Sequence, residues 1–296
     1  MKVSETELKP ICEDGVMKGR RLRNRYLKEL KVQVEQLKEK YGRVPNLATV
    51  LVGDDEGSKM YVRMKHKSCA KIGVESKNIE LPATISEDEL LKIISDLNAD
   101  ENVTGILVQL PLPKHIDENK VIQAIDPIKD VDGFHPMNVY NLVIGKEDLV
   151  AATPKGIITL LEASNIEIQG KHVVIINRSM IVGKPLLFLM LNRNATVTMC
   201  HSKTKDLKHF TKQADILVTA IGRRRSENDP FYITEDMVRE DAIVIDVATP
   251  YGDADFENLK GKVKCITPVP GGVGPMTIAM LMKNVVRAFE LQMQRK

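Results

Sequence analysis

The feature that most constrains this chain is the alternation of helical stripes with short runs of strand-forming residues. Early in the chain, apolar residues recur at helical spacing from Leu22 to Tyr41, and Gly42 and Pro45 then stop the helix. Later, runs rich in Val and Ile occur at residues 172–177, 196–200, 216–221 and 242–247. Parallel strands covered on both faces form continuous apolar runs of this kind, whereas half-exposed strands alternate. The pattern predicts an α/β protein with a parallel sheet between helices.

A length of 296 residues with 43% hydrophobic side chains suits two medium domains with buried cores. We expect one α/β domain over residues 1–150, joined by a C-terminal helix at 275–296. The second domain, over residues 151–274, carries the Val- and Ile-rich runs and is expected to be Rossmann-like.

Composition argues against several classes of protein. The 43 basic and 40 acidic side chains give a net charge of +3, and only 4% of residues are aromatic, so nucleic-acid binding is not favoured. No apolar run approaches the roughly 20 residues of a membrane helix. The polar start, MKVSETELKP, lacks the apolar stretch of a signal peptide. The four widely spaced cysteines predict reduced thiols rather than a disulfide framework or a metal site, and therefore a cytoplasmic protein.

Polar residues follow two of the expected strands of the second domain. The first strand leads through Arg178 and Ser179 to Gly183 and a helix, which turns backbone N–H groups and the positive end of the helix toward an anion. Only one of the three glycines of the dinucleotide fingerprint is present, so an ordinary strand-to-helix turn is the alternative. The next strand leads into residues 201–204, where a Rossmann fold contacts the adenosine ribose. Ser202, Lys203 and Arg178 suit a 2′-phosphate there, with a solvated loop as the alternative.

Four further patterns carry candidate chemistry. Tyr61 and Lys65 share a helix face, and a lysine with a lowered pKa can act as a base or orient water, although a surface lysine is the commoner outcome. Gln109 ends an apolar run before two prolines, where α/β sheets place ligand groups. Residues 130–136 (DVDGFHP) combine two carboxylates, a turn and a histidine, without a second cluster that would complete a metal site. Residues 268–275 (PVPGGVGP) have three glycines before a helix, which favours a ligand loop over a plain one.

Five of these motifs together closely resemble the bifunctional methylenetetrahydrofolate dehydrogenase/methenyltetrahydrofolate cyclohydrolase family. In chain order they are Tyr61 with Lys65, the Gln109 segment, residues 130–136, the turn from Arg178 to Pro185, and the glycine-rich loop that begins at residue 268. The resemblance covers about residues 12–290. It implies oxidation of 5,10-methylenetetrahydrofolate by NADP and hydrolysis of the methenyl product to 10-formyltetrahydrofolate, within one-carbon metabolism and the supply of purine biosynthesis. It also implies a homodimer and a last helix that returns to the first domain, a return that the sequence pattern alone does not give.

The resemblance assigns roles to individual residues. Lys65 is implied as the key cyclohydrolase residue, with Tyr61 beside it and Gln109 tuning it, and Asp132 is implied to hold the pterin ring. The implied substrate contacts also include Leu110, Pro270, Gly271 and Gly272. The implied cofactor contacts are Asn177, Arg178, Ser179, Ser202 and Thr249.

The chain departs from the family pattern at three places. Asn177 stands where glycine is common, residues 247–250 (VATP) replace Val-Gly-Ile-Asn, and Arg223–Arg225 follows Gly222. The departure at 247–250 puts the geometry of Thr249 in doubt. For the arginines, a solvated charge run is the default, with a phosphate role left open.

The sequence leaves three alternatives open. A shikimate-dehydrogenase-like oxidoreductase shares the order of domains but does not account for Gln109 or the glycine-rich loop. A non-catalytic folate- or NADP-binding regulator is disfavoured by the intact Tyr61, Lys65, Gln109 and Asp132. NAD as cofactor is disfavoured because no acidic residue follows the second strand until Asp206, whereas NAD-selective sites usually place one there.

Overall fold

The computed structural model describes residues 11–295, and the polar start considered for a signal peptide, residues 1–10, lies outside them. Contacts divide the described chain into two compact units. The three-stranded unit comprises residues 25–152 and 278–295, and the seven-stranded unit comprises residues 11–24 and 153–277. Two long helices, α1 (Gly19–Tyr41) and α10 (Val273–Gln294), each begin in the seven-stranded unit and continue into the other.

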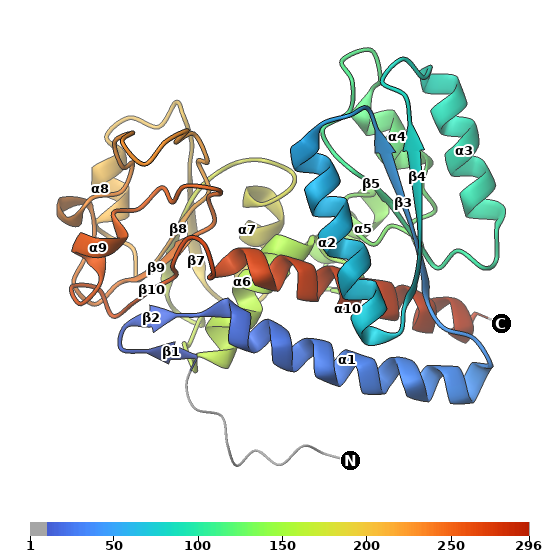
Figure 1. Cartoon of the computed structure of the whole chain (residues 1–296). Coiled ribbons are helices and arrows are strands. Elements are labelled where there is room, and N and C mark those ends of the chain that lie inside the picture. Colours follow the sequence, from blue (N-terminus) through green and yellow to red (C-terminus); the bar gives the residue numbers. More distant parts are fainter. Residues whose placement is uncertain (1–10, 296) are drawn as a thin grey trace. The chain divides into compact units, whose positions relative to one another are not determined.

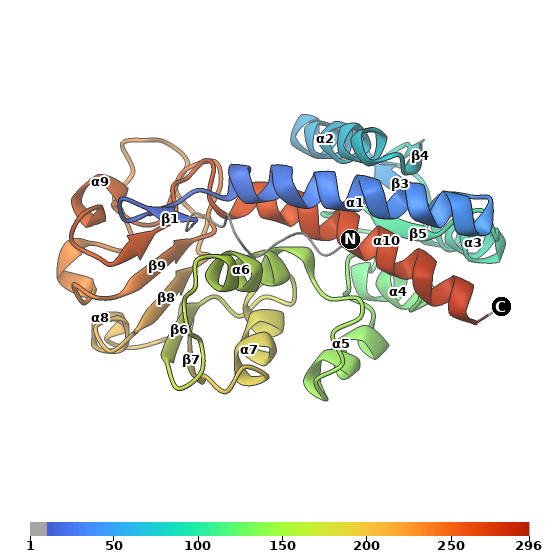
Figure 2. The same ribbon diagram turned by 90° about the horizontal axis from the view of Figure 1, so that it is seen from below.

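The three-stranded unit is built on a parallel sheet. Its strands lie in the order β4 (Glu75–Leu81), β3 (Asn46–Val52) and β5 (Gly105–Val108). Helices α2 (Glu56–Ile72) and α3 (Glu87–Ala99) lie on opposite sides of it (Figures 1 and 2). Alternate residues of β3 pack on α3 and α4 (Glu118–Ala124), and α5 (Pro136–Val143) follows the loop that contains Asp132.

The seven-stranded unit has the parallel sheet that the Val- and Ile-rich runs predict. Its order is β1-β2-β10-β9-β8-β6-β7, and β6 to β10 are mutually parallel. Consecutive residues of β6 are fully buried, so both faces of the sheet are covered. The elements from β6 onward are β6 (His172–Ile176), β7 (Thr196–Cys200), β8 (Ile216–Thr219), β9 (Ile243–Asp246) and β10 (Cys265–Ile266). Among the helices of this unit are α6 (Ala152–Ala163), α7 (Gly183–Leu191), α8 (Leu207–Thr211), η2 (Glu235–Met237) and α9 (Phe256–Leu259).

The N-terminal hairpin of β1 (Cys12–Glu13) and β2 (Val16–Met17) extends this sheet. Val16 pairs with Ile266 of β10, which is why residues 11–24 pack with the seven-stranded unit rather than with the expected 1–150 domain. The expectation of four reduced thiols is wrong. Cys12 and Cys265 form a disulfide with their Cα atoms 6.4 Å apart, because strand pairing unites positions 253 residues apart in sequence. The other two cysteines are free and buried.

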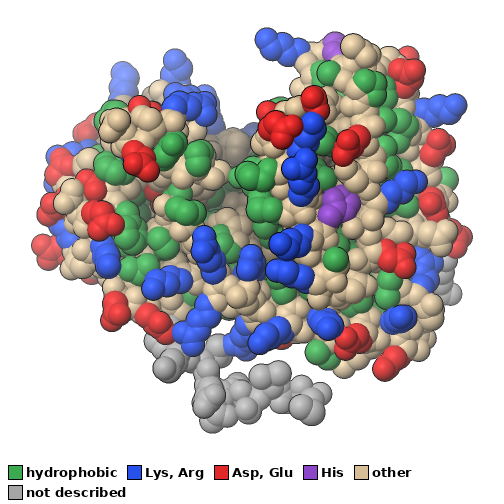
Figure 3. Space-filling view, viewed as in Figure 1, with side chains coloured by type: hydrophobic (Ala, Val, Ile, Leu, Met, Phe, Trp, Pro, Cys, Tyr) green, Lys and Arg blue, Asp and Glu red, His purple; other side chains and the backbone are tan. Residues whose placement is uncertain are grey.

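The C-terminal helix returns to the three-stranded unit, as the resemblance implies. The Sγ of Cys69 on α2 lies 3.6 Å from the Sδ of Met282 on α10. Within residues 11–295 no helix has the length and apolarity needed to cross a membrane. On the face shown in Figure 3, Lys and Arg side chains are interspersed with Asp and Glu, in keeping with the net charge of +3.

Candidate active site

Lys65 lies in the middle of a well-terminated helix. The side chain of Asp55 accepts a hydrogen bond from the backbone N–H of Ser58 at the start of α2, and Gly73 ends the helix in the left-handed conformation with φ of 80°. Tyr61 is one turn before Lys65 and keeps 40% of its surface exposed. Local sequence therefore fixes the helix that presents both side chains, as their spacing predicts.

Gln109 contacts Lys65 directly. The backbone N–H of Gln109 donates to Val50 O and so extends the β5–β3 ladder by one residue. Its side-chain Oε1 accepts a hydrogen bond of 2.9 Å from Lys65 Nζ, while its Nε2 donates to Leu110 O at 2.7 Å. The second bond fixes the orientation of the carboxamide, so that its oxygen faces the amine.

The loop that contains Asp132 is shaped by a buried carboxylate that the sequence did not single out for this role. Asp130 accepts hydrogen bonds from the backbone N–H groups of Gly133 and His135 and from Asn138 Nδ2, at 2.8 to 3.0 Å. Three donors converging on one carboxylate hold the turn in a single conformation. Asp130 thus acts on the site through the position it gives to Asp132.

Asn284 on α10 supports the same loop. Its Nδ2 donates to the carbonyl oxygens of Val131 and Val150, both at 2.8 Å, and its side chain is buried. Gly133 is equally constrained, because a Cβ there would lie 2.6 Å from the backbone carbon of Val150. A polar residue among the apolar positions of the last helix was the available signal for Asn284, and the sequence-based prediction missed it.

Lys65 and Asp132 influence each other's ionisation. Burial lowers the pKa of the Lys65 ammonium, and the charge of Asp132 opposes that shift. Burial raises the pKa of Asp132 to about 6, with Asp130 adding to the rise and Lys65 opposing it. A lysine with a lowered pKa supplies more neutral amine at neutral pH, and a neutral amine can accept a proton from water.

The seven-stranded unit gathers the predicted cofactor residues at one edge of its sheet. Strands β6 to β10 are parallel, so the segments that follow them lie at the same, carboxyl edge. Strand β6 lies between β7 and β8, which makes this the point where the strand order reverses and where dinucleotides bind in such sheets. Asn177, Ser202, Thr249 and the loop at 268–272 all follow these strands.

Asn177 organises the first of these segments. Its Oδ1 accepts hydrogen bonds from the backbone N–H groups of Ser179 and Gly183, and its Nδ2 donates to Ala220 O beyond β8. A Cβ on Gly183 would lie 2.2 Å from Asn177 O, so this position requires glycine. The departure from glycine at position 177 therefore gives the turn a side-chain cap and joins the ends of β6 and β8.

Arg178 and Ser202 leave their donors available. Both are exposed, and among residues 11–295 the guanidinium of Arg178 has no hydrogen-bond or ion-pair partner. His201 Nδ1 accepts from Lys203 N, and Thr204 Oγ1 accepts from His201 N, so the loop around Ser202 is folded on itself. An unpaired guanidinium and a hydroxyl are a donor set that suits a phosphate.

The glycine-rich loop is explained partly by packing. Gly272 is buried, and a Cβ on it would lie 2.7 Å from the Cβ of Thr267 and 2.8 Å from the carbonyl oxygen of Pro268. Pro270 is exposed and Gly271 partly exposed, with φ of 117° at Gly271. Close packing against Thr267 and Pro268 accounts for Gly272, whereas Pro270 and Gly271 remain accessible.

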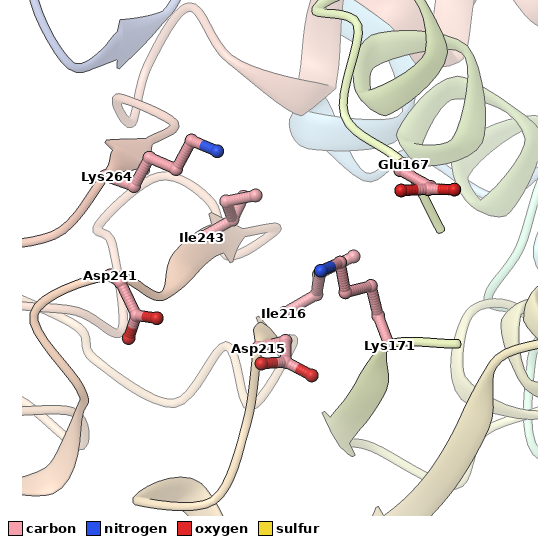
Figure 4. A pocket seen from close by; sticks show the side chains of 7 residues that line it. All are labelled: Glu167, Lys171, Asp215, Ile216, Asp241, Ile243 and Lys264. Carbon is pink, nitrogen blue, oxygen red and sulfur yellow. The ribbon is translucent and has the colours of Figure 1, made fainter. Parts of the chain in front are cut away.

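A pocket of about 120 Å³ lies at the opposite edge of the seven-stranded sheet (Figure 4). Its lining residues precede or begin strands β6, β8, β9 and β10 and are Glu167, Lys171, Asp215, Ile216, Asp241, Ile243 and Lys264. Ligands of parallel sheets bind outside the carboxyl ends of the strands, so this amino edge is not the cofactor site.

Known proteins of one family match both halves of the chain. Residues 17–132 match the family described as "Tetrahydrofolate dehydrogenase/cyclohydrolase, catalytic domain", and residues 151–293 match its "NAD(P)-binding domain". The chain belongs to the tetrahydrofolate dehydrogenase/cyclohydrolase family. It is accordingly a bifunctional enzyme that acts on tetrahydrofolate derivatives, with a dinucleotide-binding domain.

Individual relatives resemble nearly the whole chain. "Bifunctional protein FolD" of Methanococcoides burtonii is 50% identical over 281 residues, which cover 93% of this chain and 96% of that protein. The crystal structure of the bifunctional FolD enzyme from Campylobacter jejuni is 44% identical, with a TM-score of 0.89, and covers 94% of this chain and 99% of that one. The FolD structure from Trypanosoma brucei, complexed with NADP and an inhibitor, is 36% identical, with a TM-score of 0.88, covering 94% and 98%.

The shikimate-dehydrogenase alternative is not supported beyond the fold. A shikimate 5-dehydrogenase from Listeria monocytogenes is 14% identical, with a TM-score of 0.54. An NAD-dependent 5,10-methylenetetrahydrofolate dehydrogenase from Saccharomyces cerevisiae, at 23% identity and a TM-score of 0.78, likewise shows the fold alone.

Proposed function

We propose that this enzyme oxidises 5,10-methylenetetrahydrofolate with NADP and hydrolyses the methenyl product at Lys65. The contact between Lys65 Nζ and Gln109 Oε1, beside Asp132, carries the second half of the proposal. It gives an amine with a lowered pKa, a fixed acceptor and a neighbouring carboxylate on three different elements.

In the proposed hydrolysis, the neutral amine of Lys65 takes a proton from the attacking water. The water oxygen bonds to the cationic methenyl carbon. The bond from that carbon to one ring nitrogen then breaks as the nitrogen is protonated, and the added hydroxyl loses its proton to solvent, which leaves the formyl C=O. Gln109 Oε1 accepts a hydrogen bond from Lys65 Nζ and keeps the nitrogen in place. Asp132 accepts hydrogen bonds from the pterin N–H groups, which orients the ring. Tyr61, Leu110, Pro270 and Gly271 are the remaining proposed substrate contacts, and Gly272 supports the last two.

The bound dinucleotide supplies a hydride acceptor, and the protein needs only to hold it at the carboxyl edge of the seven-stranded sheet. The available guanidinium of Arg178 and the hydroxyl of Ser202 favour NADP over NAD, because they suit a 2′-phosphate. The NADP in the Trypanosoma brucei complex is consistent with this choice. Asn177 and Ser179 act by shaping the turn beside Arg178, and Thr249 is a proposed backbone contact.

For the cell, we propose a cytoplasmic homodimer whose 10-formyltetrahydrofolate supplies purine biosynthesis. The proposal rests on the family resemblance. The Cys12–Cys265 disulfide argues against a cytoplasmic location, because cytoplasmic thiols are usually kept reduced. Rapid alkylation in cell lysates, under denaturing conditions that expose the buried thiols, tests it: four alkylated cysteines support the cytoplasm, and two contradict it.

One absorbance experiment tests the function. Purified enzyme receives 5,10-methylenetetrahydrofolate and NADP, and the NADPH and methenyl signals are followed. We expect NADPH to accumulate while the methenyl signal rises and then decays as hydrolysis proceeds. A binding protein without activity gives neither signal, and a chain that prefers NAD, with or without added phosphate, contradicts the cofactor choice.

A further inference from the structure

Two loops at the carboxyl edge of the seven-stranded sheet contain departures from the family pattern. The first follows β8 and contains Arg223–Arg225, and the second follows β9 and contains residues 247–250. The first loop starts next to the end of β6, where the strand order reverses. Its Ala220 O accepts a hydrogen bond from Asn177 Nδ2, which follows β6. Its conformation therefore bears on the dinucleotide site.

Arg224 differs from its two neighbours. It is 5% exposed, whereas Arg223 and Arg225 are exposed to solvent. Its Nε and one terminal nitrogen donate to the carbonyl oxygens of Asp229 and Glu227, within its own loop, at 2.9 and 2.8 Å.

The guanidinium of Arg224 also reaches the second loop. Its other terminal nitrogen donates to Gly252 O at 2.7 Å, and its central carbon lies 3.9 Å from the centre of the Phe231 ring. All three guanidinium nitrogens of Arg224 thus donate to backbone carbonyls, and one face of the group is stacked.

The second loop returns the connection. Asp253 accepts hydrogen bonds from Thr219 Oγ1 and from the backbone N–H groups of Ile221 and Gly222, at 2.6 to 3.0 Å. The loop after β8 thus donates from the side chain of Arg224 to the backbone of the loop after β9. In the other direction, the side chain of Asp253 in the loop after β9 accepts from the backbone of the loop after β8.

Within the second loop, Asp246 closes the segment on itself by accepting from the backbone N–H groups of Ala248 and Ala254. Gly252 has little freedom there, because a Cβ on it would lie 2.7 Å from Asp246 Oδ2. The carbonyl oxygen that Arg224 binds is consequently held in place from both sides.

We propose that Arg224 is a positioning residue for the dinucleotide site, which fixes the loops after β8 and β9 and binds no phosphate. The inference rests on the cofactor site proposed above. In this role Arg224 joins the loop that contains residues 223–225 to the loop that contains residues 247–250 by a buried hydrogen bond.

An arginine that binds phosphate and an arginine that positions loops predict different kinetics when they are replaced. A phosphate ligand discriminates between NADP and NAD, which differ by the 2′-phosphate. A residue that holds loops affects both dinucleotides alike, because they share the nicotinamide and pyrophosphate portions. Misplacement of binding groups by about 1 Å can cost up to about 100-fold in rate.

The experiment compares Arg224→Met and Arg224→Lys with Arg225→Met, which removes the same charge from an exposed position in the same loop. Michaelis constants and kcat are measured for NADP and for NAD, and methenyl hydrolysis is measured separately, because Lys65, Gln109 and Asp132 all belong to the other unit. We expect Arg224→Met to lower kcat/KM by about tenfold or more with both dinucleotides, by the same factor, and to leave hydrolysis at the parent rate. Arg224→Lys, which retains the charge and some donors, should recover part of that loss, and Arg225→Met should show a smaller effect.

Other outcomes overturn the proposal. A loss confined to NADP makes Arg224 a phosphate ligand, and unchanged kinetics with both dinucleotides remove it from the site. A parallel fall in hydrolysis shows general unfolding rather than positioning, and Arg224→Lys, as the milder variant, is then decisive in the same assays. If the parent enzyme uses neither dinucleotide, the proposed function fails, independently of Arg224.

Discussion

The Lys65 site and the carboxyl edge of the seven-stranded sheet hold their polar groups in different ways. At the first, side chains contact one another: Lys65 donates to Gln109, and Asp132 lies close enough to shift the pKa of the lysine. At the second, side chains such as Asn177 bind backbone, and the donors of Arg178 remain exposed. Chemistry on a substrate requires ionisation tuned by neighbours, whereas recognition of a dinucleotide requires a rigid backbone with free donors at its surface.

The largest expected effect comes from a change confined to the Lys65 site. Lys65→Met removes the proposed proton acceptor, so hydrolysis of methenyltetrahydrofolate should fall by about 10²- to 10⁴-fold, the usual contribution of a general base. The decay of methenyl absorbance measures it. The protein should stay folded and bind NADP as the parent does, because no cofactor residue belongs to the same unit.

The control for this change is Lys67→Met, which removes an exposed lysine from the same helix. Hydrolysis should then proceed at the parent rate. If Lys65→Met also retains the parent rate, Lys65 has no part in the mechanism and the contrast between the two regions disappears.

The next effect concerns substrate binding in the same region. Asp132→Ala removes the acceptor of the pterin N–H groups, and loss of one charge-assisted hydrogen bond costs about 1.5–3 kcal/mol, or roughly 10- to 150-fold. Both activities should fall in kcat/KM, with NADP affinity nearly unchanged. Because the pKa of Asp132 is raised to about 6, the parent should also lose folate affinity as the pH falls through that value and the carboxylate is protonated.

Asp132→Asn should retain part of the affinity, since an amide oxygen still accepts one hydrogen bond, and should remove the pH dependence near 6. Steady-state kinetics at several pH values give both results. Selective loss of NADP binding would instead place Asp132 in the cofactor site.

A third change tests the second region by its selectivity. Arg178→Ala should raise the Michaelis constant for NADP by roughly 10- to 150-fold, the equivalent of one charge-assisted hydrogen bond, and barely change that for NAD. Rates with each dinucleotide, with and without inorganic phosphate, measure it. Equal losses with both would mean that Arg178 holds the turn rather than the 2′-phosphate.

The sequence predicted the strands of the seven-stranded sheet well because buried parallel strands leave continuous Val and Ile runs. The run 196–200 coincides with β7, and the others differ from their strands by one or two residues at the ends. The two-residue strands of the N-terminal hairpin left no such run. Their pairing with β10, and with it the disulfide of Cys12, depends on contacts distant in sequence.

The site residues also divide into those with a local sequence pattern and those that depend on contacts distant in sequence. Lys65 and Gln109 were predicted from local patterns and the resemblance, and the structure brings them within hydrogen-bonding distance. Asn284 and Arg224 were not assigned their supporting contacts, because their partners are backbone carbonyls. A backbone carbonyl has no sequence signature, so such contacts appear only when the fold places the chain segments together.

The smallest expected effect tests whether support from such a residue matters to the first region. Asn284→Leu keeps the side chain at similar size but leaves the carbonyl oxygens of Val131 and Val150 buried without their donor. An unsatisfied buried group costs about 1–3 kcal/mol, so urea unfolding should show a loss of about that size. The released loop should also raise the Michaelis constant for methylenetetrahydrofolate a few-fold, less than Asp132→Ala does, with the dinucleotide constants unchanged. Gln294→Leu, which removes an exposed amide from the same helix, should change neither stability nor kinetics. A loss of stability without any change in the folate constant would show that Asn284 supports the fold but not the position of Asp132. The Lys65 site would then owe its geometry to Asp130 and to direct side-chain contacts alone.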